Sequence, residues 1–351
     1  MKIAQIAPLA EAVPPRLYGG TERIVSYLTE ELVRQGHQVT VFASGDSRTR
    51  AELVACAPKA LRLDPSVRDP MPHVLMMLDE VRRRAHEFDI LHFHMDLFHF
   101  PVFTDIAGQT VTTLHGRLDL PDLQPFYRRF QEFPLVSISN DQRQPLLGAH
   151  WAGTVYHGLP PELHRFTPSN DQGDYLAFLG RISPEKRPDR AIEIARRAGL
   201  PLRIAAKVDN ADRGYFEREI KPLLADPLVE FVGEIGDADK SEFLGNARAL
   251  LFPIDWPEPF GLVVIESMAC GTPVIAFARG SVPEIVEDGL TGFIVHDIEQ
   301  AARAVGRLAE LDRRQVRRQF EQRFSVARMA SDYLEIYRHL ARTSAPRLRI
   351  A

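Results

Sequence analysis

The feature that most constrains the fold of this chain is an alternation of short apolar segments with amphipathic segments, which stops once and then starts again. An apolar run at residues 2–7 is followed by an amphipathic segment at 21–35 and a second apolar run at 39–43. This rhythm is typical of parallel strands whose faces are covered by helices. The sequence therefore predicts an α/β protein built on parallel sheets.

The first amphipathic segment carries signals for both ends of a helix. Thr21 can cap the first turn, and Ile24, Leu28 and Leu32 recur at helical spacing on one face. Gly36 can adopt the left-handed conformation that often ends a helix. We therefore predict a helix that is capped by Thr21 and ended by Gly36.

The remaining pattern divides the predicted elements into two groups. Strands are expected at 2–7, 39–43, 90–94, 110–114 and 135–139 in the first group, and at 175–179, 202–206, 229–232, 249–253, 273–277 and 293–295 in the second. Helices are expected at 72–88, 125–131, 190–198 and 213–224, and over most of the tail from 298 to 341. Polar, Pro-rich stretches at 159–162 and 167–173 suit neither regular element, so we place the domain connection there.

This division predicts two Rossmann-like domains whose parallel sheets face each other across a cleft. The first domain is expected to span 1–165 and the second 174–325, with a further helix at 326–351. Sheets of this class bind ligands beyond the carboxyl ends of their strands. A ligand site is therefore expected where those ends line the cleft.

Composition excludes several classes of protein. A chain of 351 residues with 45% hydrophobic and 26% charged residues fits two soluble domains, and a net charge of −4 gives no basic field for nucleic acid. Cys56 and Cys270 have no paired spacing for a disulfide framework or a zinc site. Basic runs at 82–84 and 313–318 are typical of solvated helix faces; one of them could also contact a membrane surface, but the sequence does not indicate such a contact. Residues 1–6 read as a strand instead of a signal peptide, so we expect a cytoplasmic protein.

The segment from Glu258 to Glu266 is the strongest functional signal. If a helix begins near Leu262, Glu266 projects from its second turn while Glu258 lies on the preceding loop. The first N–H groups of a helix bind anions, because they have no internal partners and carry the positive end of the helix dipole. Two carboxylates beside such donors suit the hydroxyls and phosphates of a nucleotide sugar. This helix is largely apolar, so Glu266 needs a ligand or a partner inside the protein.

Two loops could contact phosphate groups. Arg181 and Lys186 follow the first strand of the second group, where a guanidinium fork and an ammonium can clamp a diphosphate. Tyr18, Gly19 and Gly20 lie between the first strand and the first helix, where glycines allow close approach of a ligand to the backbone. Either loop could equally be an ordinary exposed loop.

The histidines near the strand ends can be interpreted in two ways, as a ligand contact or as metal ligands. His115 follows the strand at 110–114, where a neutral imidazole could hydrogen-bond a substrate hydroxyl at the rim of the cleft. His92 and His94 share one strand face and Asp96 follows, a spacing that can hold a metal. This set resembles the start of the metal motif of metallo-β-lactamase-like hydrolases, although position 97 is Leu instead of His.

Taken together, these motifs and their order make the chain resemble the GT-B glycosyltransferases of family 4, the group 1 type. The most specific part runs over 252–276, which includes the Glu258–Glu266 segment, and the stretch at 289–293 follows it. The resemblance covers nearly the whole chain. It implies two facing Rossmann-like domains, with the helix at 326–351 crossing back onto the first domain.

The resemblance also implies an activity. Members of this family bind a nucleotide sugar mainly in the second domain and an acceptor mainly in the first, and they retain the anomeric configuration without requiring a metal. We therefore expect a hexosyltransferase that uses a donor of the UDP-glucose or GDP-mannose type and no cofactor. The acceptor is expected to be a small molecule, a saccharide or a lipid, and the sequence does not identify it.

By the same resemblance, Glu266 would hold the ribose hydroxyls and Glu258 the hexose hydroxyls. The residues implied at the donor site are Gly19, Gly20, Arg181, Lys186, Glu258, Phe260, Gly261, Leu262, Val263 and Glu266, and those implied in catalysis are His115, Arg181, Lys186 and Glu258. Because no further carboxylate is evident as a nucleophile, we expect attack from the front face, with the departing phosphate taking the proton of the acceptor.

Two positions depart from the family pattern, because Arg187 and Pro259 stand where glycine is common. They leave the identity of the donor sugar open. Two alternatives also remain at this stage: a metal-dependent hydrolase that uses His92, His94 and Asp96, and a non-catalytic protein that binds sugar nucleotides.

Overall fold

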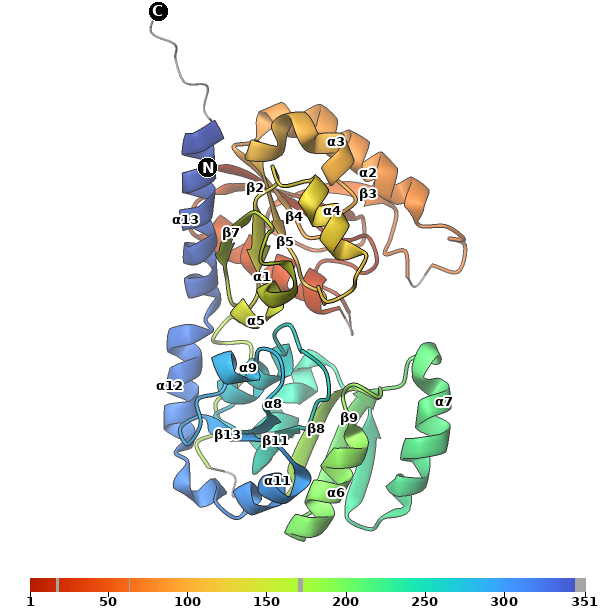
Figure 1. The fold of residues 1–351 in the computed structure, drawn as a ribbon, viewed down its shortest axis with the longest axis vertical. Helices are drawn as coiled ribbons and strands as arrows, with labels where there is room; N and C mark the ends of the chain where they lie inside the picture. Colours follow the sequence, from red (N-terminus) through yellow and green to blue (C-terminus); the bar gives the residue numbers. More distant parts are fainter. Residues whose placement is uncertain (17–18, 63, 170–172, 345–351) are drawn as a thin grey trace, which may run out of the picture. The chain divides into compact units, whose positions relative to one another are not determined.

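The computed structural model describes residues 1–16, 19–62, 64–169 and 173–344, so Tyr18 lies outside the described residues. The described chain forms two compact units (Figure 1). The first contains residues 1–158 together with the segment that begins at Val326, and the second contains residues 159–325. Each unit holds one parallel sheet covered by helices, as the sequence predicts.

The chain passes between the units earlier than the sequence indicates. The backbone N–H of Leu159 donates to the carbonyl of Phe324 at 2.9 Å, and that of Thr167 donates to Cys270 at 3.0 Å. The guanidinium of Arg313 also donates to the carbonyl of Thr167 at 2.9 Å. These contacts make residues 159–167 part of the second unit, and they satisfy backbone groups that the Pro-rich stretch cannot pair within itself.

The first unit is built on a sheet of seven parallel strands in the order β3-β2-β1-β4-β5-β6-β7. The strands are β1 (Lys2–Ile6), β2 (Gln38–Ser44), β3 (Glu52–Ala57), β4 (Ile90–Phe93), β5 (Thr110–Thr113), β6 (Leu135–Ser137) and β7 (Trp151–Thr154). The helices are α1 (Gly20–Arg34), α2 (Met71–Arg84), α3 (Phe100–Phe103), α4 (Leu123–Arg129), α5 (Asn140–Arg143) and α13 (Val326–Ser344). The strands β3 and β7 were not predicted.

The second unit contains six parallel strands in the order β10-β9-β8-β11-β12-β13. They are β8 (Leu176–Arg181), β9 (Leu202–Lys207), β10 (Val229–Gly233), β11 (Ala249–Phe252), β12 (Val274–Phe277) and β13 (Gly292–Val295). The helices are α6 (Pro188–Ala198), α7 (Arg213–Tyr215), α8 (Asp237–Gly245), α9 (Leu262–Ala269), α10 (Val282–Ile285), α11 (Ile298–Val305) and α12 (Arg313–Arg323).

Both sheets reverse their strand order at one point. In the first unit this point lies between β1 and β4, and in the second it lies between β8 and β11. Because chain connections leave in opposite directions there, a crevice opens beyond the carboxyl ends of the two central strands. The loops that follow β1, β4, β8 and β11 are therefore the expected places for ligand-binding residues.

Two predicted helices differ in detail. The helix α1 begins at Gly20, after Gly19 with a φ of 151°, and no side chain caps it, so the predicted cap by Thr21 is wrong. The predicted helix at 213–224 is only one turn of α-helix, which continues as a π-helical segment at Phe216–Ile220 and a 3₁₀ segment at Lys221–Ala225.

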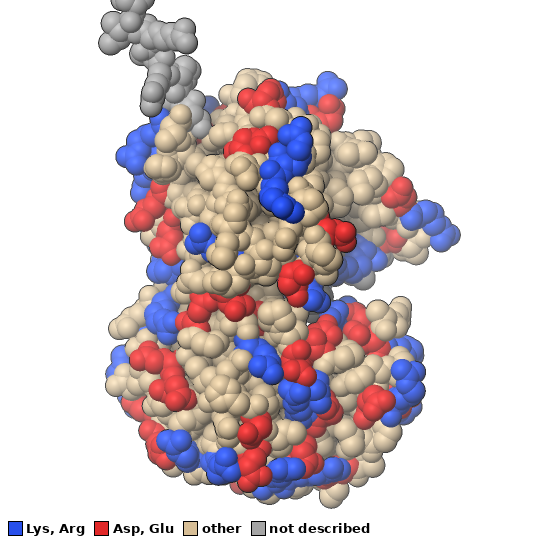
Figure 2. All heavy atoms as spheres, viewed as in Figure 1, with Lys and Arg blue, Asp and Glu red and all other residues tan. Residues whose placement is uncertain are grey.

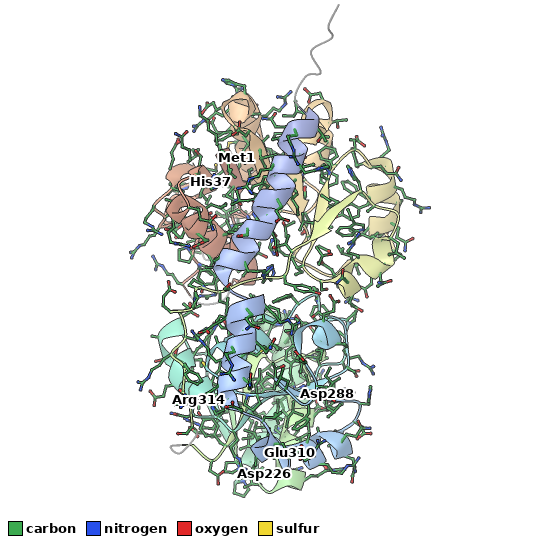
Figure 3. The ribbon with its side chains drawn as sticks, turned by 90° about the vertical axis from the view of Figure 1, so that its left-hand side faces the viewer. Met1, His37, Asp226, Asp288, Glu310 and Arg314 are labelled. Carbon is green, nitrogen blue, oxygen red and sulfur yellow. The ribbon has the colours of Figure 1, made fainter. Side chains whose placement is uncertain are left out.

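The helix α13 belongs to the core of the first unit. Its side chains Met329, Tyr333 and Tyr337 are fully buried, and it packs against α1. Nearby, the amino group of Met1 lies 3.2 Å from Nδ1 of His37 (Figure 3). None of the helices in the described part of the chain is long and apolar enough to cross a membrane.

Candidate functional site

The predicted helix start at Leu262 is confirmed, and it lies at the reversal point of the second sheet. The loop after β11 ends at Gly261, which has a φ of 83° and precedes the first residue of α9. A Cβ atom at Gly261 would lie 3.1 Å from the ring of Phe252 at the end of β11. The glycine therefore permits both the turn and the close packing that direct the N-terminus of α9 toward the carboxyl edge of the sheet.

The loop that carries Glu258 is held in place by hydrogen bonds from the segment that follows β12. The N–H of Ser281 donates to the carbonyl of Glu258 at 3.0 Å, and its hydroxyl donates to the carbonyl of Phe260 at 2.9 Å. Gly280 has a φ of 55°, and a Cβ atom there would lie 2.3 Å from the backbone nitrogen of Glu258. Gly280 and Ser281 thus fix the loop, although no sequence pattern pointed to them.

Glu258 is buried and interacts with a cation and an aromatic donor. Its Oε2 atom accepts hydrogen bonds from Nζ of Lys186 and, at 3.0 Å, from Nε1 of Trp256. The ammonium of Lys186 also lies 5.1 Å from the ring centroid of Trp256 and 5.7 Å from that of Phe252. The structure therefore brings together two residues, 72 positions apart in sequence, that were predicted to share one site.

Glu266 is buried on the second turn of α9, as predicted, and its partner is a lysine. Its Oε1 atom lies 2.7 Å from Nζ of Lys240 on α8, and that ammonium is also 3.2 Å from Asp237. This ion pair accounts for a carboxylate in an otherwise apolar helix. Lys240 was not identified from the sequence, because nothing along the chain indicates that α8 places it beside α9.

Arg181 ends β8 and lies among three acidic side chains. Its Nη2 atom is 2.5 Å from Oε1 of Glu185, Nε is 3.5 Å from Asp212 and Nη1 is 3.8 Å from Asp209. Burial raises the pKa of Asp212, and the charge of Arg181 opposes that rise. Arg181 at the end of β8 and Lys186 on the loop that follows are thus each paired with a carboxylate.

The remaining candidate residues belong to the first unit. Gly19 and Gly20 lie at the N-terminus of α1, in the connection that follows β1. His115 follows β5 by two residues, is partly buried, and has a pKa lowered to about 3 by burial. These residues lie beyond carboxyl strand ends, as predicted.

His92 and His94 use their ring nitrogens for hydrogen bonds within the protein. Those of His92 lie 2.7 Å from the hydroxyls of Tyr337 and Thr113, and those of His94 lie 2.9 Å from Nε2 of His115 and 2.7 Å from Oε1 of Gln5. Over the described residues, no group of three or more His, Cys, Asp and Glu side chains is arranged to hold a metal ion. The hydrolase alternative, which needed His92, His94 and Asp96 as ligands, is therefore not supported.

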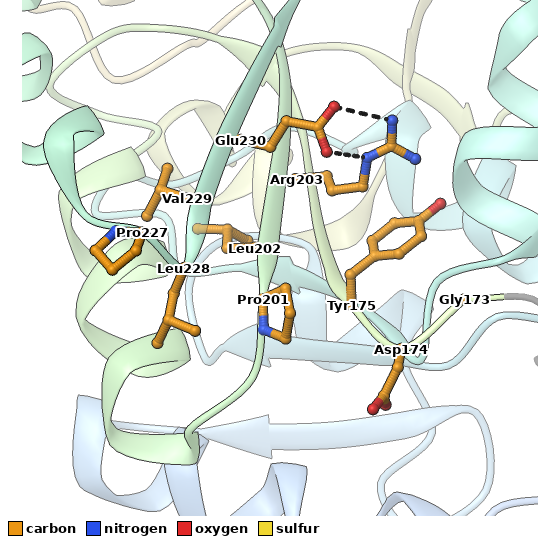
Figure 4. Close-up of a pocket in the computed structure, with 10 residues that line it drawn as sticks. All are labelled: Gly173, Asp174, Tyr175, Pro201, Leu202, Arg203, Pro227, Leu228, Val229 and Glu230. Atoms are coloured by element: carbon orange, nitrogen blue, oxygen red, sulfur yellow. Dashed lines mark hydrogen bonds and ion pairs between the residues drawn. The ribbon is translucent and has the colours of Figure 1, made fainter.

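An open pocket lies at the opposite edge of the second sheet (Figure 4). It is bounded by the amino-terminal ends of β8, β9 and β10, and the ion pair of Arg203 with Glu230 lies along it at 2.8 Å. Ligands of doubly wound sheets bind at the carboxyl ends. This pocket is therefore not the candidate site.

The surface of the second unit carries charges of both signs. On the face drawn in Figure 2, acidic and basic side chains are interspersed over this unit. The positive charge at the candidate site therefore comes from the individual side chains of Arg181 and Lys186, and not from a basic surface of the whole unit.

Comparison with protein families identifies both halves of the chain. Residues 161–324 match the model described as glycosyl transferases group 1, and residues 18–140 match the model described as glycosyltransferase family 4. A D-inositol 3-phosphate glycosyltransferase of Saccharomonospora viridis is 34% identical over 184 residues, which cover 46% of this chain and 42% of the relative. The chain thus matches less than half the length of this curated relative.

Solved structures share the fold over nearly the whole chain. A sucrose-phosphate synthase from Thermosynechococcus elongatus has a TM-score of 0.78 at 19% identity and covers 97% of this chain and 99% of its own. Anabaena HepE in complex with UDP and glucose has a TM-score of 0.73 at 19% identity, with 97% and 100% covered. At this identity the likeness establishes the architecture alone.

Proposed function

Since the chain belongs to the GT-B glycosyltransferases of family 4, the group 1 type, we propose that it transfers a hexose from a nucleoside diphosphate sugar to an acceptor hydroxyl with retention of configuration. The observation that carries this proposal is the placement of Arg181, Lys186, Glu258 and Glu266 around the reversal point of the second sheet. Cations for a diphosphate lie at the end of β8 and on the loop after it, and carboxylates for hydroxyls lie on the loop after β11 and on α9.

In the proposed complex, the diphosphate replaces carboxylates that now neutralise the two cations. Arg181 exchanges its contact with Glu185 for phosphate oxygens, which its planar fork can bind in pairs. Lys186 exchanges part of its contact with Glu258, and that carboxylate then accepts hydrogen bonds from hexose hydroxyls. Glu266 accepts hydrogen bonds from the ribose hydroxyls, while N–H groups of Gly261, Leu262 and Val263 at the start of α9 face the phosphate and sugar.

The proposed chemistry relies on stabilising the leaving group. The bond between the anomeric carbon and the phosphate oxygen breaks, and the acceptor oxygen bonds to the same face of that carbon. The proton of the acceptor passes to the departing phosphate oxygen, so no protein base is needed. Arg181 and Lys186 lower the barrier by offsetting the charge that develops on the phosphate. This scheme requires no metal and no cofactor.

Nucleotide binding tests the donor site directly. We expect one of UDP, GDP and ADP to raise the thermal unfolding midpoint by several degrees, because a ligand at about 100 times its Kd adds roughly 2.7 kcal/mol. The variant Glu266→Ala should lose most of this shift. The variant Glu299→Ala, which removes an exposed carboxylate on α11, should keep it. A shift that is equal in Glu266→Ala and the unaltered protein would contradict the assignment.

Turnover tests the reaction itself. Slow hydrolysis of UDP-glucose or GDP-mannose without an acceptor should release the hexose first as the anomer present in the donor, which proton NMR can follow. We expect Lys186→Ala to lower this rate by about 100- to 1,000-fold, the effect of removing one preorganised charged contact to a developing anion. Inverted product would overturn the retaining scheme, and tight nucleotide binding without turnover would favour a non-catalytic sugar-nucleotide-binding protein.

A further inference from the structure

A chain of hydrogen-bonded side chains connects His115 to the interior of the first unit. His94 follows β4, and its Nδ1 atom lies 2.9 Å from Nε2 of His115. Its other nitrogen, Nε2, lies 2.7 Å from Oε1 of Gln5 on β1. Because β1 and β4 are adjacent parallel strands, with Gln5 paired to His92, their side chains meet beneath the reversal point of the sheet.

A second branch holds the amide of Gln5. Its Nε2 atom donates to the hydroxyl of Tyr337 on α13 at 3.4 Å, and that hydroxyl lies 2.7 Å from Nδ1 of His92. The other nitrogen of His92 lies 2.7 Å from the hydroxyl of Thr113, which is 2.9 Å from the hydroxyl of Tyr333. With the amide nitrogen directed at Tyr337, the amide oxygen is directed at His94.

The direction of each hydrogen bond follows from the available donors. The amide oxygen of Gln5 only accepts, so Nε2 of His94 carries a proton and donates it. Burial lowers the pKa of His94 well below its usual value, so this imidazole is neutral and its Nδ1 is an acceptor. The donor to Nδ1 must then be the Nε2–H of His115. Since His115 is also neutral, its own Nδ1 carries a lone pair.

We propose that Gln5 and His94 are positioning residues that hold His115 as the tautomer protonated on Nε2, so that Nδ1 accepts a hydrogen bond from a ligand hydroxyl. Among the described residues, His115 makes no hydrogen bond through Nδ1. The tautomer follows from the first unit alone, whereas a hydroxyl of the donor hexose as the ligand rests on the proposed function. In this state His115 cannot donate a proton to a phosphate oxygen through Nδ1.

The tautomer can be measured without substrate. In protein labelled with ¹⁵N-histidine, long-range proton–nitrogen correlation spectra distinguish the two neutral tautomers. We expect His115 to carry its proton on Nε2, with a nitrogen–nitrogen coupling across the hydrogen bond to Nδ1 of His94. A spectrum that shows His115 protonated on Nδ1 would overturn the proposal. Because the measurement uses the unaltered protein, it does not depend on whether any variant folds.

Two substitutions of His94 separate positioning from packing. In His94→Asn, the side-chain oxygen can take the place of Nδ1 as acceptor, so the Nε2–H signal of His115 should persist. In His94→Leu no acceptor is left, so this proton should exchange with water and both tautomers should be observed. As a control, Tyr333→Phe removes one hydroxyl of the second branch but leaves His94 in place, and it should not change the His115 signal.

Kinetics give a second readout. We expect His94→Leu to lower the rate of donor hydrolysis about 10-fold, as loss of one oriented hydrogen bond does, and His94→Asn to restore most of it. Equal losses in the two variants would show that His94 acts by packing alone and would overturn the proposal. UDP binding is measured on the same samples. If UDP does not bind while the tautomer is as expected, the donor assignment fails and the positioning role stands.

Discussion

Arg187 has left-handed backbone geometry, with a φ of 53° and a ψ of 54°, at the residue that precedes α6. A residue with a side chain in this region costs about 1–2 kcal/mol, a cost that glycine avoids. In this chain the guanidinium contacts Asp189 at 2.7 Å and Asp255 at 3.0 Å. These partly exposed ion pairs offset only part of the backbone strain.

The variant Arg187→Gly is therefore expected to be as stable as the unaltered protein or slightly more stable. Arg187→Ala keeps the strained conformation and loses the same ion pairs, so it should be less stable than Arg187→Gly by about 1 kcal/mol. Urea unfolding followed through the fluorescence of Trp256, in a Trp151→Phe background, reports on the second unit. Equal stability of the two variants would show that the backbone strain is small.

His99 makes the stability of the first unit depend on pH. His99 is fully buried, stacks on Phe93 at 3.8 Å between ring centroids, and has its Nε2 atom 2.9 Å from the hydroxyl of Thr112. Burial lowers its pKa well below the usual value. The unfolded chain therefore takes up a proton near a pH of about 6.5, and the folded chain does not. Above that pH, His99 therefore does not reduce the free energy of unfolding. As the pH drops below it, the free energy of unfolding falls.

The variant His99→Phe should remove one proton from this linkage. Below about pH 6, its free energy of unfolding should fall less steeply than that of the unaltered protein, by about 1.4 kcal/mol per pH unit. The matched control is Thr112→Val, which loses the same hydrogen bond but keeps the imidazole, and it should retain the full slope. Urea titrations between about pH 5 and pH 7.5 measure these slopes. Identical slopes in His99→Phe and the control would contradict this account.

At the scale of elements, the start of α9 depends on Gly261 for two reasons, its left-handed conformation and its close packing against Phe252. Gly261→Ala would place a methyl group 3.1 Å from Phe252 in a left-handed conformation, so we expect a loss of about 1–2 kcal/mol and weaker nucleotide binding. Gly289 has a similar φ of 76°, but a Cβ atom there would meet no other atom within 4 Å, so Gly289→Ala should cost about 1 kcal/mol and leave binding unchanged. Calorimetric titration with UDP distinguishes the two. Normal binding by Gly261→Ala would remove this turn from the site.

The sequence predicts elements well where the local pattern and the burial agree. The central strands and the start of α9 at Leu262 were predicted because they are apolar throughout or have clear turn residues. The strands β3 and β7 were missed, although β10, another largely half-exposed edge strand, was predicted; β7 includes Gly153 and Thr154, which weaken its local pattern. An edge strand forms through pairing with its neighbour, and a local pattern records that pairing only weakly.

The sequence indicates which loops after strands, and which turn of α9, carry the residues expected at the candidate site, but it does not indicate their partners. Lys240 is 26 residues from Glu266, and Tyr337 is 245 residues from His92. Such pairs form only when the sheets and helices are assembled. The left-handed conformation of Arg187 was also missed, since it is imposed by the β8–α6 connection and opposes the preference of the residue.

At the scale of the whole molecule, the chain leaves the first unit at Gly158 and returns to it at Val326. The second unit is therefore one continuous segment, whereas the first is completed by α13. Removing α13 would expose to water the faces that contact Tyr333 and Tyr337, and it would remove the tyrosine hydroxyls that bond to Gln5, His92 and Thr113. Burying one large apolar side chain contributes about 1.5–3 kcal/mol, so losing the packing of several such side chains would remove a large part of the stability of one domain.

We expect the fragment 159–325 to fold alone and the fragment 1–158 to remain largely unfolded. Joining residues 326–344 to residue 158 through a short Gly/Ser linker should restore folding of the first unit, because the backbone nitrogen of Gly158 lies only 3.2 Å from the sulfur of Met329. Circular dichroism and urea unfolding measure all three proteins. A variant of the joined protein with Tyr333→Ala and Tyr337→Ala serves as the control, and it should unfold like 1–158. Cooperative unfolding of 1–158 with full stability would show that α13 attaches to a domain already complete without it.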